Sequence, residues 1–283
     1  MPSTFISADE LSQHLNEKGW VIVDCRYVLG RPQAGKELYR QGHIPGARYA
    51  DLEDDLSGTA VAGLTGRHPL PAGPDLVSTL RGFGISSDSQ VIAYDDGSGQ
   101  MAAARLWWLL RWAGHQSVAV LDGGLAEWVR KKLPLSSGVE PVAPGRFQAR
   151  FHPEMVATTD QVLASLDAGG MVLADSRAPD RFRGDNESID PVAGHIPGAV
   201  SVPFLENLDA GGRSLPPEQL RRRFESLQPR GSEMIFYCGS GVTAAQNVLA
   251  HCAAGLSGSR LYAGSWSEWI TDPGRPVETG GPA

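Results

Sequence analysis

Four sequence blocks occur twice in this chain of 283 residues, and they occur in the same order both times. The first copy contains VIVDCR (21–26), GHIPGARYADL (42–52), AYDDGSGQ (93–100) and LDGGLAEW (121–128), and the second contains VLADSR (172–177), GHIPGAVSVPFL (194–205), FYCGSGVT (236–243) and LYAGSWSEW (261–269). Because the order is preserved and the second copy is only slightly shorter between blocks, the repeat indicates a duplication rather than chance. The sequence therefore predicts two homologous domains.

Each copy carries short apolar runs that stand before Gly-rich turns. The runs are VIV, VIAY and VAVL in the first copy and MVLA, MIFY and LY in the second. They do not alternate apolar with polar residues, which is typical of strands buried on both faces of a parallel sheet. The sequence pattern of residues 76–84 and of residues 101–114 predicts two crossover helices, each of which ends at a glycine. The predicted class is α/β, with two tandem domains that each contain a mostly parallel sheet flanked by helices.

A stretch without periodicity lies between the two copies. Residues 133–153, LPLSSGVEPVAPGRFQARFHP, begin with Ser, Pro and Gly and show neither a helical nor a strand pattern. We therefore expect a first domain over residues 1–135, a linker over 136–152 and a second domain over 153–283.

Charge and cysteine content limit the classes of partner. With 25 Lys and Arg against 32 Asp and Glu, the net charge is −7, which disfavours nucleic acid or an anionic membrane as the main partner. No apolar run approaches the ~20 residues of a membrane span, and the first residues lack a signal-peptide pattern, so we expect a cytoplasmic protein. The three cysteines, Cys25, Cys238 and Cys252, fit neither a disulfide framework nor the spacing of metal ligands.

Cys238 is the candidate nucleophile. It follows the apolar run MIFY and precedes GSGVT, after which the sequence predicts a helix that ends at Gly255. In such a loop, backbone N–H groups and the helix dipole would stabilise a thiolate or a persulfide anion. Gly239 and Gly241 permit the sharp turn. The alternative is a cysteine packed in the core, the commoner fate of free Cys, but the loop favours an exposed nucleophile.

In combination, the motifs resemble those of the two-domain rhodanese-type sulfurtransferases over nearly the whole chain. The resemblance rests on DCR and DSR, both GHIPGA blocks, CGSGVTA, LDGGLAEW and AGSWSEW. The loop CGSGVT is more similar to that of the 3-mercaptopyruvate sulfurtransferases than to that of the thiosulfate-using enzymes, which carries basic residues after the cysteine. The resemblance implies that Cys238 takes sulfane sulfur from a small anionic donor and passes it, as a persulfide, to a thiophilic acceptor such as cyanide or a thiol. It implies no cofactor, and a thiol reductant such as thioredoxin is a candidate partner.

The resemblance also assigns roles to further residues. Ser240, His68 and Glu53 match a proposed relay of hydroxyl, imidazole and acid that would move the proton needed when the enolate of the donor forms. The residues expected to bind the donor are Arg181, Gly239, Gly241, Val242 and Thr243. Asp95 stands at the position of Cys238 in the first copy, so one site per chain is expected.

The identity of the donor stays open at this point. Mercaptopyruvate enzymes of the family usually have a further Arg before GHIPGA, whereas residues 185–193, DNESIDPVA, contain no basic residue. A thiosulfate:cyanide sulfurtransferase with the same cysteine is therefore the first alternative. A cysteine phosphatase would need an Arg where Ala244 stands. A catalytically idle binding module is an alternative of another class, and the intact CGSGVT loop argues against it.

Other conspicuous residues occur in both copies, including the copy without a nucleophile, and we therefore interpret them as parts of the fold. They are His43 and His195 in the GHIPGA blocks, and the pairs Asp24 with Arg26 and Asp175 with Arg177 at the strand ends. Trp107, Trp108 and Trp112 follow one helical pattern, which favours packing over a cofactor site.

Overall fold

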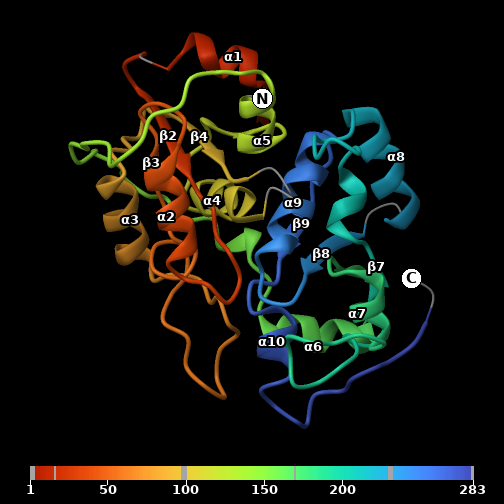
Figure 1. The fold of residues 1–283 in the computed structure, drawn as a ribbon. Coiled ribbons are helices and arrows are strands. Elements are labelled where there is room, and N and C mark those ends of the chain that lie inside the picture. The colour runs from red at the N-terminus through yellow and green to blue at the C-terminus, as the bar shows by residue number, and fades with distance from the viewer. Residues whose placement is uncertain (1–3, 16, 97–100, 169, 229–231, 282–283) are drawn as a thin grey trace. The chain divides into compact units, whose positions relative to one another are not determined.

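The computed structural model describes residues 4–15, 17–96, 101–168, 170–228 and 232–281, which fall into two compact units. The first unit comprises Met1–Gly58, Pro71–His152 and Ala210–Ser214, and the second comprises Thr59–Leu70, Pro153–Asp209 and Leu215–Ala283. The orange segment Thr59–Leu70 in Figure 1 therefore belongs to the second unit, although it precedes much of the first unit in the sequence.

The first unit contains a parallel five-stranded sheet in the order β1-β5-β4-β2-β3 (Figure 1). Its strands are β1 (Phe5–Ile6), β2 (Trp20–Asp24), β3 (Arg48–Tyr49), β4 (Gln90–Tyr94) and β5 (Val118–Leu121). Its helices are α1 (Ala8–Gln13), α2 (Ala34–Gln41), α3 (Gly73–Gly82), α4 (Met101–Trp112) and α5 (Gly124–Arg130). In β4, the neighbours Val91 and Ile92 point to opposite faces and are both fully buried, which explains why the apolar runs do not alternate.

The second unit contains a parallel four-stranded sheet in the order β7-β6-β8-β9. Its strands are β6 (Met171–Asp175), β7 (Val200–Ser201), β8 (Glu233–Tyr237) and β9 (Ser259–Leu261). Its helices are η1 (Pro153–Met155), α6 (Thr159–Ala168), α7 (Pro179–Arg183), η2 (Phe204–Asn207), α8 (Pro217–Leu227), α9 (Thr243–Ala253) and α10 (Ser265–Trp269). A single parallel bridge between Val156 and Leu261 takes the place that the β1–β5 pairing has in the first unit.

Both units thus confirm the predicted α/β class with parallel sheets. The predicted helices 76–84 and 101–114 correspond to α3 and α4, and the helix after Cys238 corresponds to α9. Residues 136–152, expected as a linker, are part of the first unit, where Ser136 pairs with His43 and the N–H of Gly145 donates to the carbonyl of Arg81. Part of the Gly-rich turn of the first copy, residues 97–100, lies outside the described residues.

The strand-end ion pairs are duplicated as expected. Arg26 Nη2 donates to Asp24 at 2.7 Å, and Arg177 Nη2 donates to Asp175 at 2.6 Å. All four side chains are buried. Burial lowers the pKa of Arg177, but the carboxylate of Asp175 outweighs it and raises that pKa above its ordinary value. Each pair therefore ties a strand end to the following loop as a charged unit.

The histidines of the two GHIPGA blocks are also structural. His43 Nδ1 donates to the carbonyl of Tyr39 at 2.8 Å, and its ring stacks on that of Tyr39. His195 Nδ1 donates to the carbonyl of Phe182 at 2.7 Å and stacks on the ring of Phe182 in the same way. Both imidazoles are buried, so each connects its block to the helix before it.

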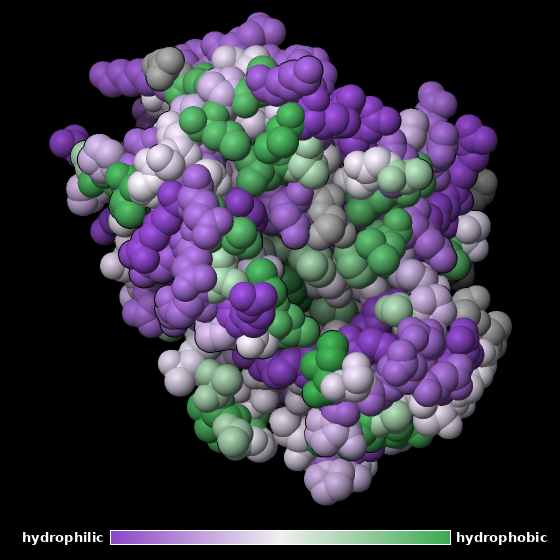
Figure 2. Space-filling model, viewed as in Figure 1, coloured by the Kyte–Doolittle hydropathy of each residue, from purple (hydrophilic) through white to green (hydrophobic). Residues whose placement is uncertain are grey.

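Apolar residues of the α4 helix form part of the core of the first unit. Trp107 is 3% exposed and Trp108 is fully buried, and Trp112 stacks on Trp108, so packing explains this pattern. On the viewed surface, Figure 2 shows hydrophilic residues interspersed with smaller apolar areas. Within the described part of the chain, each helix is too short or too polar to cross a bilayer.

Candidate active site

The strand β8 and the helix α9 position Cys238. The residue directly follows β8 at the carboxyl edge of the sheet, and α9 begins at Thr243, so residues 238–242 form a tight loop. The N–H of Gly241 donates to the Sγ of Cys238 at 3.1 Å. A donor from the loop and the positive end of the helix dipole both stabilise negative charge on this sulfur. The loop has the geometry that the sequence predicts, with a backbone donor and a helix N-terminus beside the sulfur.

The short helix α10 fixes the backbone of the loop through hydrogen bonds. The N–H groups of Trp266 and Ser267 donate to the carbonyls of Cys238 and Gly239, each at 2.9 Å. The N–H of Cys238 itself donates to Ser265 Oγ at 3.1 Å. These bonds occupy both carbonyl oxygens and fix the loop backbone, which explains why the AGSWSEW block accompanies the CGSGVT loop.

Gly241 is required by the loop conformation. Its φ is +75°, a region that favours glycine, and a Cβ atom at this position would lie 2.3 Å from the carbonyl oxygen of Ala263. Any other residue would therefore have to displace backbone as well as adopt a strained φ. Cys238 itself is only 2% exposed, so the nucleophile is more enclosed than the loop pattern indicates.

The first copy builds the same scaffold around a carboxylate. The N–H groups of Leu125 and Ala126 donate to the carbonyls of Asp95 and Asp96 at 2.9 and 3.0 Å, as α10 does in the second unit. The carboxylate of Asp95 accepts from the N–H of Ala103 on α4 at 3.3 Å. A negative group thus occupies the corresponding place, but it cannot carry sulfur as a thiol does.

The structure brings together two members of the predicted relay. His68 Nδ1 and Ser240 Oγ are 2.8 Å apart, and both side chains are buried. Glu53 lies in the first unit, where its carboxylate accepts from the hydroxyl of Tyr27 at 2.6 Å. The structure thus shows a hydrogen bond between His68 and Ser240, whereas the relay role of all three residues stays a prediction.

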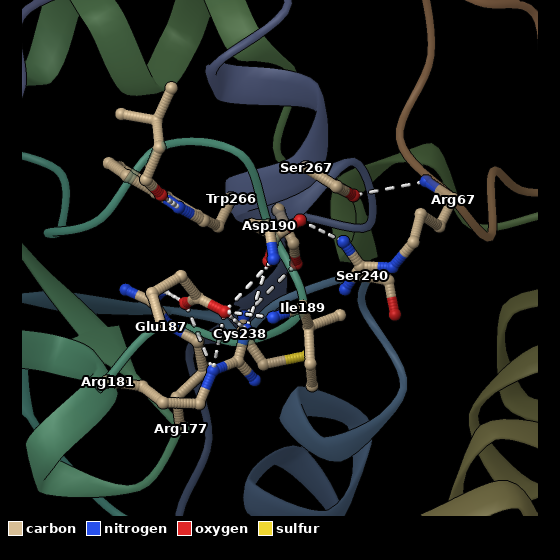
Figure 3. A network of polar contacts seen from close by, with 12 residues as sticks. Arg67, Arg177, Arg181, Glu187, Ile189, Asp190, Cys238, Ser240, Trp266 and Ser267 are labelled. Carbon is tan, nitrogen blue, oxygen red and sulfur yellow. Dashed lines mark hydrogen bonds and ion pairs between the residues drawn. The ribbon is translucent and has the colours of Figure 1, made fainter. Parts of the chain in front are cut away.

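Two guanidinium groups flank the loop of residues 238–242 (Figure 3). A Cβ atom placed on Gly239 would lie 2.9 Å from Nη2 of Arg67 and 3.6 Å from both Nη atoms of Arg181. Arg181, the residue expected to bind the donor, lies on the short helix α7. Arg67 is a residue that sequence reasoning missed. Its signal was its position directly before His68 in GRHPLP, and it supplies the second cation that residues 185–193 lack.

Acidic residues of the 185–193 segment hold these cations (Figure 3). Asp190 bridges Arg67 and Arg181, with its Oδ2 at 3.0 Å from Nη2 of Arg181. Glu187 accepts from Arg181 at 2.9 Å and forms an ion pair with Arg177 at 3.4 Å. Burial raises the pKa of Glu187, but the hydrogen bond from Arg181, the backbone N–H groups of Ile189 and Asp190 and the charge of Arg181 together lower that pKa below its ordinary value. Glu187 is therefore ionised and fixes Arg181 beside the loop.

The remaining residues expected to bind the donor lie at the start of α9, and the two other cysteines lie outside the loop. Val242 is buried at the N-terminus of α9, and Thr243 is the first residue of that helix. Burial, together with the nearby carboxylate of Asp24, raises the pKa of Cys25 well above its ordinary value, so Cys25 stays a thiol. Cys252 is half-buried on α9. Among the residues that the structure describes, we find no cluster of His, Cys, Asp and Glu that could hold a metal ion.

The fold and the cysteine loop define a protein with two rhodanese-like domains. The family model of the rhodanese-like domain matches the chain twice, over residues 7–131 and 158–272, and the chain belongs to this family. It is a sulfurtransferase with tandem domains.

Three known proteins illustrate the similarity of this chain to sulfurtransferases. A protein of Pseudomonas aeruginosa named "Probable 3-mercaptopyruvate sulfurtransferase" is 50% identical over 97% of this chain and 98% of its own length. A protein of Mycobacterium tuberculosis that carries the name of a thiosulfate sulfurtransferase, SseB, is 42% identical over 92% of this chain and 90% of its own. The crystal structure of the 3-mercaptopyruvate sulfurtransferase SseA from Escherichia coli matches with a TM-score of 0.83 at 33% identity, covering 94% of this chain and all of that one.

Proposed function

We propose that this sulfurtransferase moves a sulfur atom from 3-mercaptopyruvate to a thiophilic acceptor through a persulfide on Cys238. The observation that carries the proposal is the Sγ of Cys238 accepting an N–H of its own loop, beside two guanidinium groups that can hold an anionic donor. The close full-length relative in Pseudomonas aeruginosa supports mercaptopyruvate as the donor.

The first half of the cycle loads the enzyme. The thiolate of Cys238 attacks the sulfur atom of mercaptopyruvate, so that an S–S bond forms and the C–S bond of the donor breaks. The electron pair of the C–S bond leaves with the carbon fragment as the enolate of pyruvate. One proton converts this enolate to pyruvate, and the enzyme retains the outer sulfur as Cys–S–SH. The loop donor of Gly241 that stabilises the thiolate is also near the persulfide formed on it.

The hydrogen-bonded pair of His68 and Ser240 is suited to deliver that proton. Ser240 lies in the loop two residues after Cys238, and its hydroxyl is 2.8 Å from the imidazole of His68. A hydroxyl oriented in this way can pass a proton to the enolate carbon and regain one from the imidazole. Glu53 as a third member of the relay is part of this proposal.

The donor is held by charge in a protein of net charge −7. We assign the carboxylate of mercaptopyruvate to Arg181 and Arg67, since a guanidinium group binds a carboxylate through paired hydrogen bonds. The loop residues Gly239, Ser240 and Gly241 carry no cationic side chain that would hold the second charge of thiosulfate. Thiosulfate is the second candidate donor, because the SseB relative in Mycobacterium tuberculosis carries that name.

The second half of the cycle returns the thiolate. A nucleophile such as cyanide or a thiolate attacks the outer sulfur, and the S–S bond breaks with its electron pair on the Sγ of Cys238. A small thiol or a dithiol reductant of the thioredoxin type is the acceptor class we propose. The low number of cysteines fits a reducing compartment, and we propose the cytoplasm.

Loading of the cysteine tests the proposal directly. The chain is incubated with mercaptopyruvate without an acceptor, and mass spectrometry of the intact protein and its peptides then locates the added sulfur. We expect one sulfur on Cys238, none in Cys238→Ser, and full loading in the matched control Cys252→Ser. Sulfur on Cys252, or transfer activity retained by Cys238→Ser, would show that the assignment is wrong.

A further inference from the structure

We propose that Asp190 is a specificity-determining residue that restricts the donor site to molecules with a single negative charge. The inference rests on the proposed function, because it takes Cys238 as the sulfur carrier. The carboxylate of Asp190 joins the two cations of the site and takes no part in the proposed reaction.

Asp190 joins two guanidinium groups that come from distant parts of the chain. Arg67 lies in the segment Thr59–Leu70, and Arg181 lies on α7. One carboxylate oxygen of Asp190 accepts from Arg67 and the other from Arg181 (Figure 3). The side chain of Asp190 is 1% exposed, compared with 32% for Arg67 and 17% for Arg181. The carboxylate is therefore enclosed beneath the cations that a donor can reach.

The position of the Arg67 guanidinium group depends on this carboxylate. Nη1 of Arg67 bonds Asp190, and Nη2 of Arg67 is the atom nearest to a Cβ placed on Gly239. The N–H of Arg67 also donates to Ser267 Oγ at 3.0 Å, which anchors its backbone to α10. Arg67 thus reaches the loop with one nitrogen held by Asp190 and the other directed toward the space over Gly239.

The charges of the network cancel. Ion pairs connect three guanidinium groups with three carboxylates, namely Arg67, Arg177 and Arg181 with Asp175, Glu187 and Asp190. A donor carboxylate can therefore be hydrogen-bonded by guanidinium nitrogens, but it meets no large excess of positive charge. The second charge of a dianion gains little attraction here and still loses hydration, so the site favours a monoanion.

Replacing Asp190 by Asn changes the charge of this network and keeps the shape of the side chain. The variant adds one net positive charge next to Arg67 and Arg181, and a dianion gains more from it than a monoanion does. We expect the ratio of kcat/KM for thiosulfate to kcat/KM for mercaptopyruvate to rise roughly tenfold. The matched control is Asp185→Asn, because Asp185 lies in the same segment but pairs with Arg183, and this control should leave the ratio unchanged.

Competitive inhibition gives a readout that does not depend on turnover. The inhibition constants of sulfate, a dianion, and pyruvate, a monoanion, are measured for the wild type and for both variants. In Asp190→Asn, we expect the inhibition constant of sulfate to fall roughly tenfold relative to that of pyruvate. Should Asp190→Asn fold poorly, Arg67→Gln removes one positive charge instead. This variant should lower the ratio of kcat/KM for thiosulfate to that for mercaptopyruvate, and should weaken the binding of sulfate relative to that of pyruvate.

The outcomes separate this inference from the proposed function. An unchanged sulfate-to-pyruvate ratio in Asp190→Asn, or an equal change in Asp185→Asn, would overturn the role of Asp190 even if mercaptopyruvate loads Cys238. Failure of mercaptopyruvate to load the wild-type cysteine would overturn the proposed donor, while the inhibition constants would still report whether Asp190 selects by charge.

Discussion

His68 Nδ1 lies 2.8 Å from Ser240 Oγ, although the two residues are 172 positions apart in the sequence. Both belong to the second unit, because the segment Thr59–Leu70 is part of that unit. The same segment carries Arg67, which bonds Asp190. One short stretch far from the catalytic loop thus supplies both an imidazole and a cation to the site.

We expect Ser240→Ala to separate the two donors. Mercaptopyruvate leaves as an enolate that needs a proton, whereas thiosulfate leaves as sulfite, which is stable as an anion. Removing a general acid costs on the order of 100-fold, so kcat with mercaptopyruvate should fall by about that factor while kcat with thiosulfate changes little. Steady-state rates with both donors and a common cyanide acceptor measure the difference.

His68→Gln is the companion variant, since it removes the proton source and can keep a hydrogen bond to Ser240. It should affect the mercaptopyruvate rate as Ser240→Ala does, and the double variant should be no slower than either single variant. An equal loss with both donors would mean that the pair only maintains the structure of the loop.

We expect Arg181→Ala to weaken donor binding. The loss of a charge-assisted hydrogen bond costs roughly 1.5–3 kcal/mol, which corresponds to a ten- to hundredfold decrease in kcat/KM. Arg183→Ala is the matched control, because Arg183 lies on the same helix and pairs with the exposed Asp185. Kinetics with mercaptopyruvate test this, and similar losses in the two variants would contradict a binding role for Arg181.

We expect Gly241→Ala to destabilise the second unit and to lower the rate of loading. A Cβ at Gly241 would lie 2.3 Å from a backbone oxygen, whereas Gly258, with a φ of +81°, has nothing within 4 Å of the same point. Gly258→Ala therefore introduces only the strain of a positive φ, about 1–2 kcal/mol. The Gly241 variant should lose more free energy of unfolding than this control in urea titrations. Equal losses would show that backbone strain alone explains the glycine.

The repeat made much of the fold predictable from the sequence. A block that occurs in both copies, such as the pair Asp175 and Arg177, is interpreted as structural because its twin, Asp24 and Arg26, lies in the copy whose Gly-rich turn has no cysteine. Cys238 was recognisable for the opposite reason, since the first copy has Asp95 in that place. Comparison of two copies within one chain thus distinguished fold elements from the candidate nucleophile.

The cation network was not predictable in the same way. Arg67 and Asp190 are 123 positions apart, and neither lies in a repeated block, so no local pattern connects them. Their meeting depends on the path of the segment Thr59–Leu70, which tertiary packing decides. The enclosure of Cys238, which is 2% exposed, likewise follows from residues outside its own loop.

A buried histidine makes the stability of the second unit depend on pH. His251 lies on α9 with its ring edge-on to those of Phe224 and Phe236, and its Nε2 donates to Gln228 at 3.2 Å. Burial lowers the pKa of His251 from 6.5 to about 4. Between these two values the unfolded chain binds a proton that the folded chain does not, so the free energy of unfolding falls as the pH falls.

From pH 7 to pH 5, this one imidazole should cost about 2 kcal/mol of unfolding free energy. His251→Phe cannot titrate and fits an aromatic environment, so its free energy of unfolding should decrease less over the same interval. Urea unfolding at pH 7 and pH 5 measures both decreases. His115, whose pKa burial also lowers, is retained in the variant, and a smaller dependence on pH should therefore persist. If the wild type and His251→Phe lost equal stability between the two pH values, His251 would not be the group that responds to acid.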